Sequence, residues 1–280
     1  DAQAVSRRTG QPLLIMTDQE GGVVTRLPGT SDVPGGAQFD GDAAWARRTA
    51  AQTGSLMRRL GINTDLAPDA DVDTASGGII GQRSFGSDPR VVSRLVRAQI
   101  CGYHAGGVAA AVKHFPGHGS TDIDSHLHTA TIEESKAQWR STDLPPFATA
   151  VRAHADLILV GHLAFPALDP SGRPATISAK LNRAQIRDRL GYHGVVVTDA
   201  LNMGGVTSWG STRDIAVRSI RAGSDLLLMP PQPATAVRAI VGAVDDGSLS
   251  RQRLNRSVER VLRLKQRLGL YADPARLPTC

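Results

Sequence analysis

The chain of 280 residues has the length of one large α/β domain and no linker divides it, so we expect a single domain over residues 1–280. Its 41% hydrophobic and 21% charged residues exclude a disordered protein, and no apolar run reaches the ~18 residues of a transmembrane helix. The net charge of +6 is scattered along helical segments and aromatic residues amount to 4%, which argues against a nucleic-acid partner.

Short apolar runs and amphipathic stretches alternate along the chain. The runs span residues 13–18, 62–69, 108–114, 156–162, 195–200 and 224–230. Between them, segments such as 43–61 and 181–191 have arginine on a polar face and end in a glycine, a usual residue at the end of a helix. Strand-length runs that alternate with helices predict parallel βαβ units.

An open doubly wound sheet and a closed barrel both fit this alternation, and two observations favour a TIM-like (β/α)8 barrel. No glycine-rich phosphate fingerprint follows the first run, where DQEGG stands. Nearly every run also ends in a residue capable of chemistry, as barrel strands do at their carboxyl ends. These residues are Asp18, Asp65, His114, His162 and Asp199.

The sequence predicts six strands rather than eight, so we expect an N-terminally incomplete barrel that lacks its first strand. Residues 1–12 resemble the end of a helix that leads into the first apolar run. We expect residues upstream of them, including an export signal, to be missing. An irregular strand near residues 174–178 would account for another part of the shortfall.

The stretch KHFPGHGSTDIDSHLH, residues 113–128, contains four of the eight histidines. Its proline and glycines predict a loop directly after a strand, with Lys113 and His114 at the strand end. Asp124 and His126 are two residues apart, so in an extended segment the carboxylate can orient the imidazole. A histidine held in this way can donate and accept a proton near neutral pH. Loop histidines exposed to solvent are the alternative.

Other strand ends and loops offer carboxylates and guanidinium groups. Asp199 follows the buried run VVVT, where it could cap the next helix or act as a carboxylate nucleophile. Asp18 and Arg26 stand in and after DQEGG, and Arg83 lies on a glycine-rich loop. Sugar hydroxyls require such groups, although each could also form a salt bridge or a turn. His162 could equally be a satisfied core histidine.

Taken together, these motifs resemble the β-N-acetylglucosaminidase branch of family 3 glycoside hydrolases. The similarity runs in order through DQEGGVVTRL, NTDLAPDADVD, RSFGSD, KHFPGHGSTDIDSH, LPPFATAV, VGHLAFP, VVVTDALNM and AGSDLLLMP. It covers most of the chain, and KHFPGHG-x4-DSH is highly specific to this branch. Many members have aspartate at the position of Ser120, a difference that affects the loop more than the chemistry.

The resemblance implies a retaining, exo-acting β-N-acetylglucosaminidase that removes terminal N-acetylglucosamine from peptidoglycan fragments through a covalent glycosyl-enzyme. Asp199 would be the nucleophile, and His126 the general acid and base with Asp124 as its partner. The residues expected to bind the terminal sugar are Asp18, Arg26, Arg83, Lys113 and His114. The resemblance implies no cofactor and no metal.

Three other functions stay open. A phosphorylase could use the same residues, because a neutral imidazole repels an anionic acceptor less than the second carboxylate of most retaining enzymes would. A metal-dependent barrel hydrolase could use the cluster of His114, His118, His126 and His128, although its spacing matches no zinc motif. The third possibility is an inactive barrel that binds sugar without cleaving it.

The remaining expectations concern the context of the protein. Cys101 and Cys280 could be two free thiols or one disulfide, and the sequence does not decide between them. The arginine-rich composition favours the cell envelope over the cytoplasm. We expect a monomer with an oligosaccharide as its partner.

Overall fold

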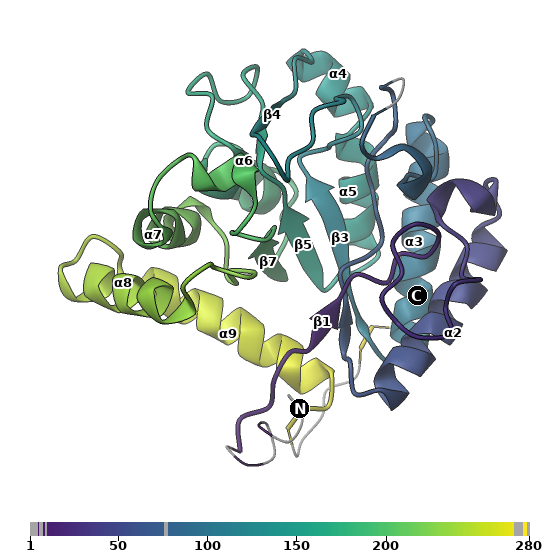
Figure 1. The fold of residues 1–280 in the computed structure, drawn as a ribbon, viewed down its shortest axis with the longest axis horizontal. Coiled ribbons are helices and arrows are strands. Elements are labelled where there is room, and N and C mark those ends of the chain that lie inside the picture. Colours follow the sequence, from purple (N-terminus) through teal and green to yellow (C-terminus); the bar gives the residue numbers. More distant parts are fainter. Residues whose placement is uncertain (1–4, 6–7, 9, 76–77, 272–276, 279–280) are drawn as a thin grey trace.

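The computed structural model describes residues 5, 8, 10–75, 78–271 and 277–278, and a parallel sheet lies at its centre (Figure 1). Its strands, in spatial order, are β1 (Met16–Thr17), β2 (Thr64–Asp65), β3 (Ala109–Phe115), β5 (Leu157–Val160) and β7 (Val195–Thr198). A parallel bridge from Val197 to Leu226 adds the last apolar run beside β7. Five of the six predicted positions are therefore strands, and the sixth run lies beside β7 through this one bridge.

Helices follow the strands, as the alternating pattern predicts. They are α2 (Ala43–Arg59), α3 (Pro89–Ala105), α4 (Lys136–Ser141), α5 (Leu144–Arg152), α6 (Gly204–Thr207), α7 (Thr212–Ala222), α8 (Pro233–Asp245) and α9 (Arg251–Arg267). The helix expected over 43–61 is α2, which begins where the side chain of Asp42 accepts a hydrogen bond from the backbone N–H of Trp45. The segment 181–191 forms a short π-helix, η4 (Ala184–Arg189).

The pleat of the strands separates two hydrophobic clusters. In β3, Ala110 and Val112 pack with α2, α3 and α5 in one cluster, while Ala109 and Ala111 face the other. The second cluster also holds Leu157 and Leu159 of β5 together with Val195 and Val197 of β7. Because alternate residues of a strand point to opposite faces, the sheet has a helix-covered outer side and an apolar inner side.

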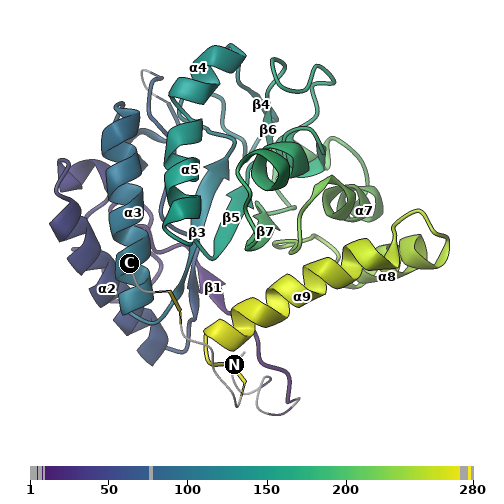
Figure 2. The ribbon, with the colours of Figure 1, turned by 180° about the vertical axis from the view of Figure 1, so that it is seen from behind.

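Helix α9 crosses the amino ends of the strands on the inner side, as Figures 1 and 2 show. Leu264 of α9 and Leu268, directly after the helix, are buried in the inner cluster. A curved parallel sheet with an apolar interior and helices outside is the arrangement of a TIM-like barrel, so the predicted fold is confirmed. The carboxyl ends of the strands lie at the opposite edge from α9.

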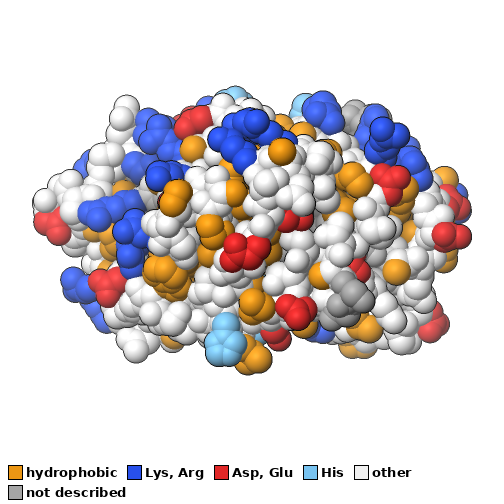
Figure 3. All heavy atoms as spheres, turned by 90° about the horizontal axis from the view of Figure 1, so that it is seen from above, with side chains coloured by type: hydrophobic (Ala, Val, Ile, Leu, Met, Phe, Trp, Pro, Cys, Tyr) orange, Lys and Arg blue, Asp and Glu red, His pale blue; other side chains and the backbone are white. Residues whose placement is uncertain are grey.

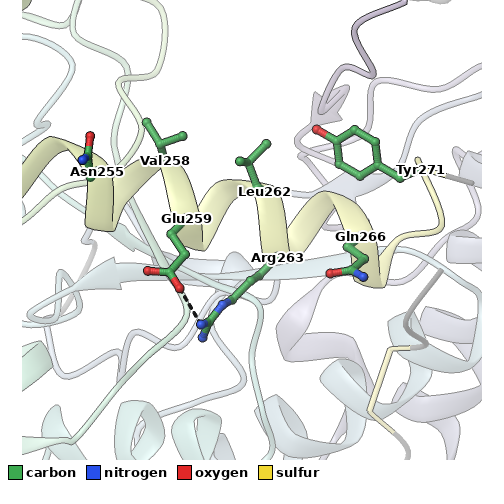
Figure 4. Close-up of a pocket in the computed structure, with 7 residues that line it drawn as sticks. All are labelled: Asn255, Val258, Glu259, Leu262, Arg263, Gln266 and Tyr271. Carbon is green, nitrogen blue, oxygen red and sulfur yellow. Dashed lines mark hydrogen bonds and ion pairs between the residues drawn. The ribbon is translucent and has the colours of Figure 1, made fainter. Parts of the chain in front are cut away.

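The outer face of α9 is partly apolar. Figure 4 shows Val258 and Leu262 along the helix with Tyr271 beyond its end, around a shallow groove. The same face has an ion pair between Glu259 and Arg263, whose closest atoms are 2.5 Å apart. On the face seen from above, Lys and Arg side chains lie in separate groups with acidic side chains between them (Figure 3).

One predicted strand is wrong. Residues 174–178 form a 3-10 helix, η3 (Ala175–Ile177), with a single antiparallel bridge from Pro174 to Ala164. The β-branched residues Thr176 and Ile177 are buried, but they contact side chains and loops and do not pair with a strand. The hydroxyl of Thr176, for example, contacts the ring of His162 and the carbonyl of Gly161. Ala164 belongs to β6 (Leu163–Ala164), which pairs with β4 (Ala130–Thr131) in a separate two-stranded sheet.

Two further expectations concern membrane spans and the cysteines. None of the helices in the described part of the chain is long and apolar enough to cross a membrane. The pairing of Cys101 with Cys280 lies outside the described residues, because Cys280 is not among them.

A buried carboxylate ties α9 to the sheet. The side chain of Asp225 is fully buried and pairs with the guanidinium groups of Arg187, Arg253 and Arg260, the last at 3.1 Å. It also accepts a hydrogen bond from the backbone N–H of Val196 in β7, at 3.0 Å. Three cations around one carboxylate compensate the cost of burying its charge, so the network depends on this single acid.

Asp225→Ala should therefore lower the free energy of unfolding by about 3–5 kcal/mol, because three arginines lose their common partner. Chemical denaturation measures this change. The control is Glu259→Gln, which breaks an exposed ion pair on α9 and should cost less than about 1 kcal/mol. Equal effects of the two substitutions would contradict the assigned importance of the Asp225 network.

Candidate active site

A cavity of about 700 Å³ opens at the carboxyl ends of the strands. Its floor is formed by residues of the inner hydrophobic cluster, among them Met16, Leu66 and Leu159. The polar residues around it include every predicted sugar-binding residue, the predicted nucleophile and the predicted general acid. These are Asp18, Arg26, Arg83, Lys113, His114, His126 and Asp199. The structure thus brings together residues that are up to about 180 positions apart in sequence, as expected for strand ends of a barrel.

Lys113 is the most deeply buried of these polar side chains, with 2% of its side chain exposed. Its ammonium group lies 2.5 Å from Asp18 Oδ1 and 2.6 Å from Glu20 Oε1. Burial lowers the pKa of Lys113, but the charges of Glu20 and Asp18 outweigh it, and the pKa lies above its usual value. Lys113 is therefore a permanent cation at the end of β3.

Arg83 and Glu20 form a bidentate pair beside Lys113. Arg83 donates from Nε to Oε2 at 2.9 Å and from Nη2 to Oε1 at 2.8 Å. Burial raises the pKa of Glu20, but the charge of Lys113 and the bonds from Arg83 lower it to about 2. The sequence analysis did not select Glu20. Its position two residues after Asp18 in DQEGG was the available signal.

His114 is neutral and has a defined tautomer. Its Nδ1 lies 2.7 Å from Asp71 Oδ2, and because a carboxylate only accepts, the hydrogen belongs on Nδ1. Its Nε2 then accepts from Arg83 Nη2 at 3.3 Å. Burial and the nearby charge of Arg83 lower the pKa of His114 to about 4. Asp71, which the sequence analysis also missed, thus sets the orientation of a predicted sugar-binding residue.

Asp199 occupies the turn that follows β7. Its backbone N–H donates to the carbonyl of Val160 at 2.9 Å, and its Oδ1 accepts from the N–H of Ala200 at 2.8 Å. Burial raises the pKa of Asp199, but His114, His162 and the Ala200 N–H lower it, and the net shift is below the usual value. Asp199 is consequently a carboxylate at neutral pH, on a backbone held by the neighbouring strand.

Asp124 and His126 form the predicted pair. Oδ1 of Asp124 lies 2.7 Å from His126 Nδ1 and accepts from the His126 backbone N–H at 2.9 Å. Burial raises the pKa of Asp124, but these two bonds lower it below its usual value. The side chain of His126 is 63% exposed and lines the cavity, so its other ring nitrogen, Nε2, is available to a ligand.

The other histidines have different roles. His162 is fully buried; its Nε2 donates to the carbonyl of Ala200 at 2.9 Å and its Nδ1 contacts the hydroxyl of Thr176 at 2.7 Å. It is a core histidine that supports the turn after Asp199. The ring of His118 is held at 3.0 Å by the hydroxyl of Ser125. His128 is exposed.

The four histidines of the metal hypothesis therefore do not converge. Within the described chain, the side chains close enough to share a metal ion are Asp69, Asp71 and His114. Arg83 Nη2 already lies 3.6 Å from Asp69 Oδ2 and 3.3 Å from His114 Nε2. A guanidinium in this position repels a second cation, so this group does not fit a metal site.

Arg26 lies at the rim of the cavity. It is exposed, and its Nη1 donates to the carbonyl of the preceding residue, Thr25, at 3.2 Å. Its backbone is fixed because the N–H donates to Gln19 Oε1 at 2.8 Å. Arg26 is thus an exposed cation at the entrance and is not part of the buried charge network.

Comparison with known proteins gives the family to which this chain belongs. The family model described as the glycosyl hydrolase family 3 N-terminal domain matches residues 1–264. The chain belongs to glycoside hydrolase family 3. A solved structure of a family 3 β-N-acetylglucosaminidase from Paenibacillus is 39% identical with a TM-score of 0.93, over 99% of this chain and 54% of its own.

Two further relatives extend the comparison within family 3. The β-hexosaminidase A of Pseudoalteromonas piscicida is 34% identical over 92% of this chain and 48% of its own length. The structure named β-glucoside phosphorylase BglX is 26% identical with a TM-score of 0.89, over 96% of this chain and 52% of its own. The chain thus spans about half the length of these three proteins.

Asp65, at the end of β2, lies beneath the site and is fully buried. Its Oδ1 accepts from the N–H of Gln19 at 2.9 Å and so supports the segment between Asp18 and Glu20. Burial raises the pKa of Asp65 to about 7. The folded state therefore binds the proton of the Asp65 carboxyl group more tightly than the unfolded state does. The stability that this bound proton contributes is lost as the pH rises from about 4 to about 7.

Replacing Asp65 by Asn removes this titration while keeping the acceptor oxygen. Between pH 5 and pH 8 the free energy of unfolding of Asp65→Asn should rise by about 2 kcal/mol relative to the unmodified protein. Urea denaturation at both pH values measures the difference. Asp245→Asn, on an exposed acid of α8, is the control and should show almost no relative change. A constant difference for Asp65→Asn would contradict the raised pKa.

Proposed function

We propose that this chain is the catalytic barrel of a retaining, exo-acting β-N-acetylglucosaminidase that releases terminal β-linked N-acetylglucosamine from peptidoglycan-derived fragments. The observation that supports this most is that ionised Asp199 and the Asp124–His126 pair face one cavity, beside buried groups suited to sugar hydroxyls. The names of the relatives, a β-N-acetylglucosaminidase and a β-hexosaminidase, favour the same activity.

The proposed reaction has two steps on the same face of the barrel. Asp199 attacks the anomeric carbon, and His126 Nε2 gives a proton to the leaving oxygen, which yields the glycosyl-enzyme and releases the leaving-group sugar. In the second step His126 takes a proton from water, and the resulting attack frees Asp199 with retention of configuration. Asp124 keeps the other ring nitrogen protonated and stabilises the imidazolium that forms.

The buried network serves recognition of the terminal sugar. Lys113, Asp18 and Glu20 offer a cation and two carboxylates within one hydrogen-bonded group, so they can donate to and accept from neighbouring hydroxyls. Neutral His114 lies beside Arg83 on the same wall. These side chains are held by each other, which limits the entropy lost when the sugar binds.

The first experiment is release of the aryl group from a chromogenic β-N-acetylglucosaminide in the presence of EDTA. Turnover supports the glycosidase and excludes both a metal-dependent hydrolase and an inactive sugar-binding barrel. The similarity to a β-glucoside phosphorylase makes phosphate the second acceptor to test. Analysis of the products in phosphate buffer distinguishes free N-acetylglucosamine from its 1-phosphate.

The loss of activity caused by His126→Ala should increase with the basicity of the leaving group. For a disaccharide the value of kcat/KM should fall by about 10²–10⁴, because the leaving alkoxide then receives no proton in the transition state. For a dinitrophenyl glycoside the loss should be less than about tenfold. His128→Ala, two residues away on the same loop, is the matched control. Equal losses on both substrates would exclude His126 as the general acid.

Asp199→Asn should abolish turnover of every substrate, with a fall in kcat of more than about 10³, because the amide cannot form the glycosyl-enzyme. Calorimetric titration with N-acetylglucosamine tests whether the variant still binds the sugar and is therefore folded at the site. Substantial activity on any substrate would reject Asp199 as the nucleophile.

A further inference from the structure

The pair Asp124–His126 lies on a long loop, here called the acid/base loop, which comprises residues 116–129. It leaves β3 and returns to β4. Its base is fixed, because the carbonyl of Gly119 accepts from the N–H groups of Thr74 and Ala75 at 2.8 and 3.0 Å. His126 itself is mostly exposed, so its side chain receives little support from packing. Something else must define where the imidazole lies relative to Asp199.

The backbone on both sides of His126 is docked on the start of α6. The N–H of Gly204 donates to the carbonyl of His126 at 2.7 Å, and the N–H of Gly205 donates to that of Ser125 at 3.1 Å. The hydroxyl of Thr129 completes the contact by donating to the carbonyl of Gly205 at 2.6 Å. Three successive hydrogen bonds thus join the loop to a two-residue segment.

This contact requires glycine at both positions. A Cβ atom on Gly204 would lie 2.1 Å from the carbonyl oxygen of Leu127, and one on Gly205 would lie 2.5 Å from that of Ser125. Real Cβ atoms do not approach backbone oxygens so closely. Neither glycine has a φ angle in the left-handed region. Close approach of the loop, and not backbone conformation, is therefore the reason for two glycines here.

The same segment begins at Asp199. Four residues separate Asp199 from Gly204. This short turn is attached to its neighbours by the bonds from Asp199 N to Val160 O and from Leu201 N to Leu228 O, both 2.9 Å. His162 supports it from below through the carbonyl of Ala200. One rigid turn therefore presents the carboxylate at its first residue and receives the acid/base loop at its last.

We propose that Gly204 and Gly205 are positioning residues of the reaction, which dock the backbone of the acid/base loop so that His126 and Asp199 keep a fixed separation. This proposal rests on the function proposed above for His126 and Asp199. The loop has a second support on its other side, where His118 bonds to Ser125 and its backbone N–H donates to Asp71 at 2.7 Å. That support ends one residue before His126, whereas the glycines hold His126 itself.

Gly204→Ala is the decisive variant, because all three atoms nearest to the added Cβ belong to the acid/base loop. The methyl group should displace the loop and leave the turn and the sugar-binding wall in place. We expect kcat/KM for a disaccharide to fall about 10- to 100-fold, since a displacement of about 1 Å can have this effect. The loss on a dinitrophenyl glycoside should be less than about threefold, with an unchanged KM for that substrate.

Gly242→Ala is the matched control. This glycine lies in α8, where an added Cβ meets nothing within 4 Å, so both substrates should be turned over as before. Thermal denaturation of all variants tests whether they fold. The double variant Gly204→Ala/His126→Ala should be no worse on the disaccharide than His126→Ala alone, because a misplaced acid and a missing acid remove the same interaction.

Each outcome is decisive. If Gly204→Ala loses activity equally on both substrates, or if its effect multiplies with that of His126→Ala, the positioning role is wrong. It is also wrong if Gly204→Ala behaves like Gly242→Ala while His126→Ala depends on the leaving group. If His126→Ala itself shows no such dependence, the proposed function of His126 fails first, and this result is distinguishable from failure of the docking contact.

Discussion

The site depends on the burial of one ammonium group, that of Lys113. An isolated charge inside a protein is costly, so the chain must supply carboxylates wherever Lys113 ends. Asp18 and Glu20 do so from the segment after β1, and Arg83 from the loop before α3 then balances the second acid. This requirement brings these two loops to the end of the central strand, β3, and leaves a wall of paired charges beside the cavity.

The two ends of the sheet differ in their contacts: helix α9 packs at the amino ends, and the cavity opens at the carboxyl ends. At the amino ends, Leu264 of α9 and Leu268, directly after the helix, are buried in the apolar interior, and Asp225 anchors the helix through arginines. At the carboxyl ends, the same interior becomes the floor of the cavity. Parallel strands make this division possible, because all their carboxyl ends meet at one edge. The charge networks of the two ends therefore serve different purposes.

The two proposed reacting groups are supported in contrasting ways. Asp199 lies on a turn bonded to neighbouring strands, while His126 lies exposed on a loop. The backbone of His126 is hydrogen-bonded to Gly204, and that of Ser125 to Gly205. Both glycines lie at the end of the turn that begins at Asp199, so the backbone that carries His126 is held by the same turn. In the proposed reaction, the exposed side chain of His126 can thereby act at a defined position without being buried.

The short apolar runs predicted the five strands of the sheet and placed Asp18, His114 and Asp199 at strand ends, since such patterns depend on neighbouring residues alone. The sixth run, 224–230, joins the sheet through one bridge only. The irregular strand at 174–178 was wrong because burial of Thr176 against His162 produces the same composition in a 3-10 helix. The sequence analysis also missed the pairing of Glu20 with Arg83 and of Asp71 with His114. An acid within a loop has the same local signature whether it faces solvent or a buried partner.

The sequence by itself determined where the strands lie along the chain and which polar groups stand at their ends. It also determined the pairing of Asp124 with His126, because these residues are only two positions apart. Only the tertiary structure decided which distant groups meet. Lys113 and Asp18 are 95 positions apart and His114 and Asp71 are 43 apart, and no local pattern encodes such contacts. The docking of His126 on Gly204 is of the same kind, because a glycine needed for close approach looks in sequence like a glycine needed for a turn.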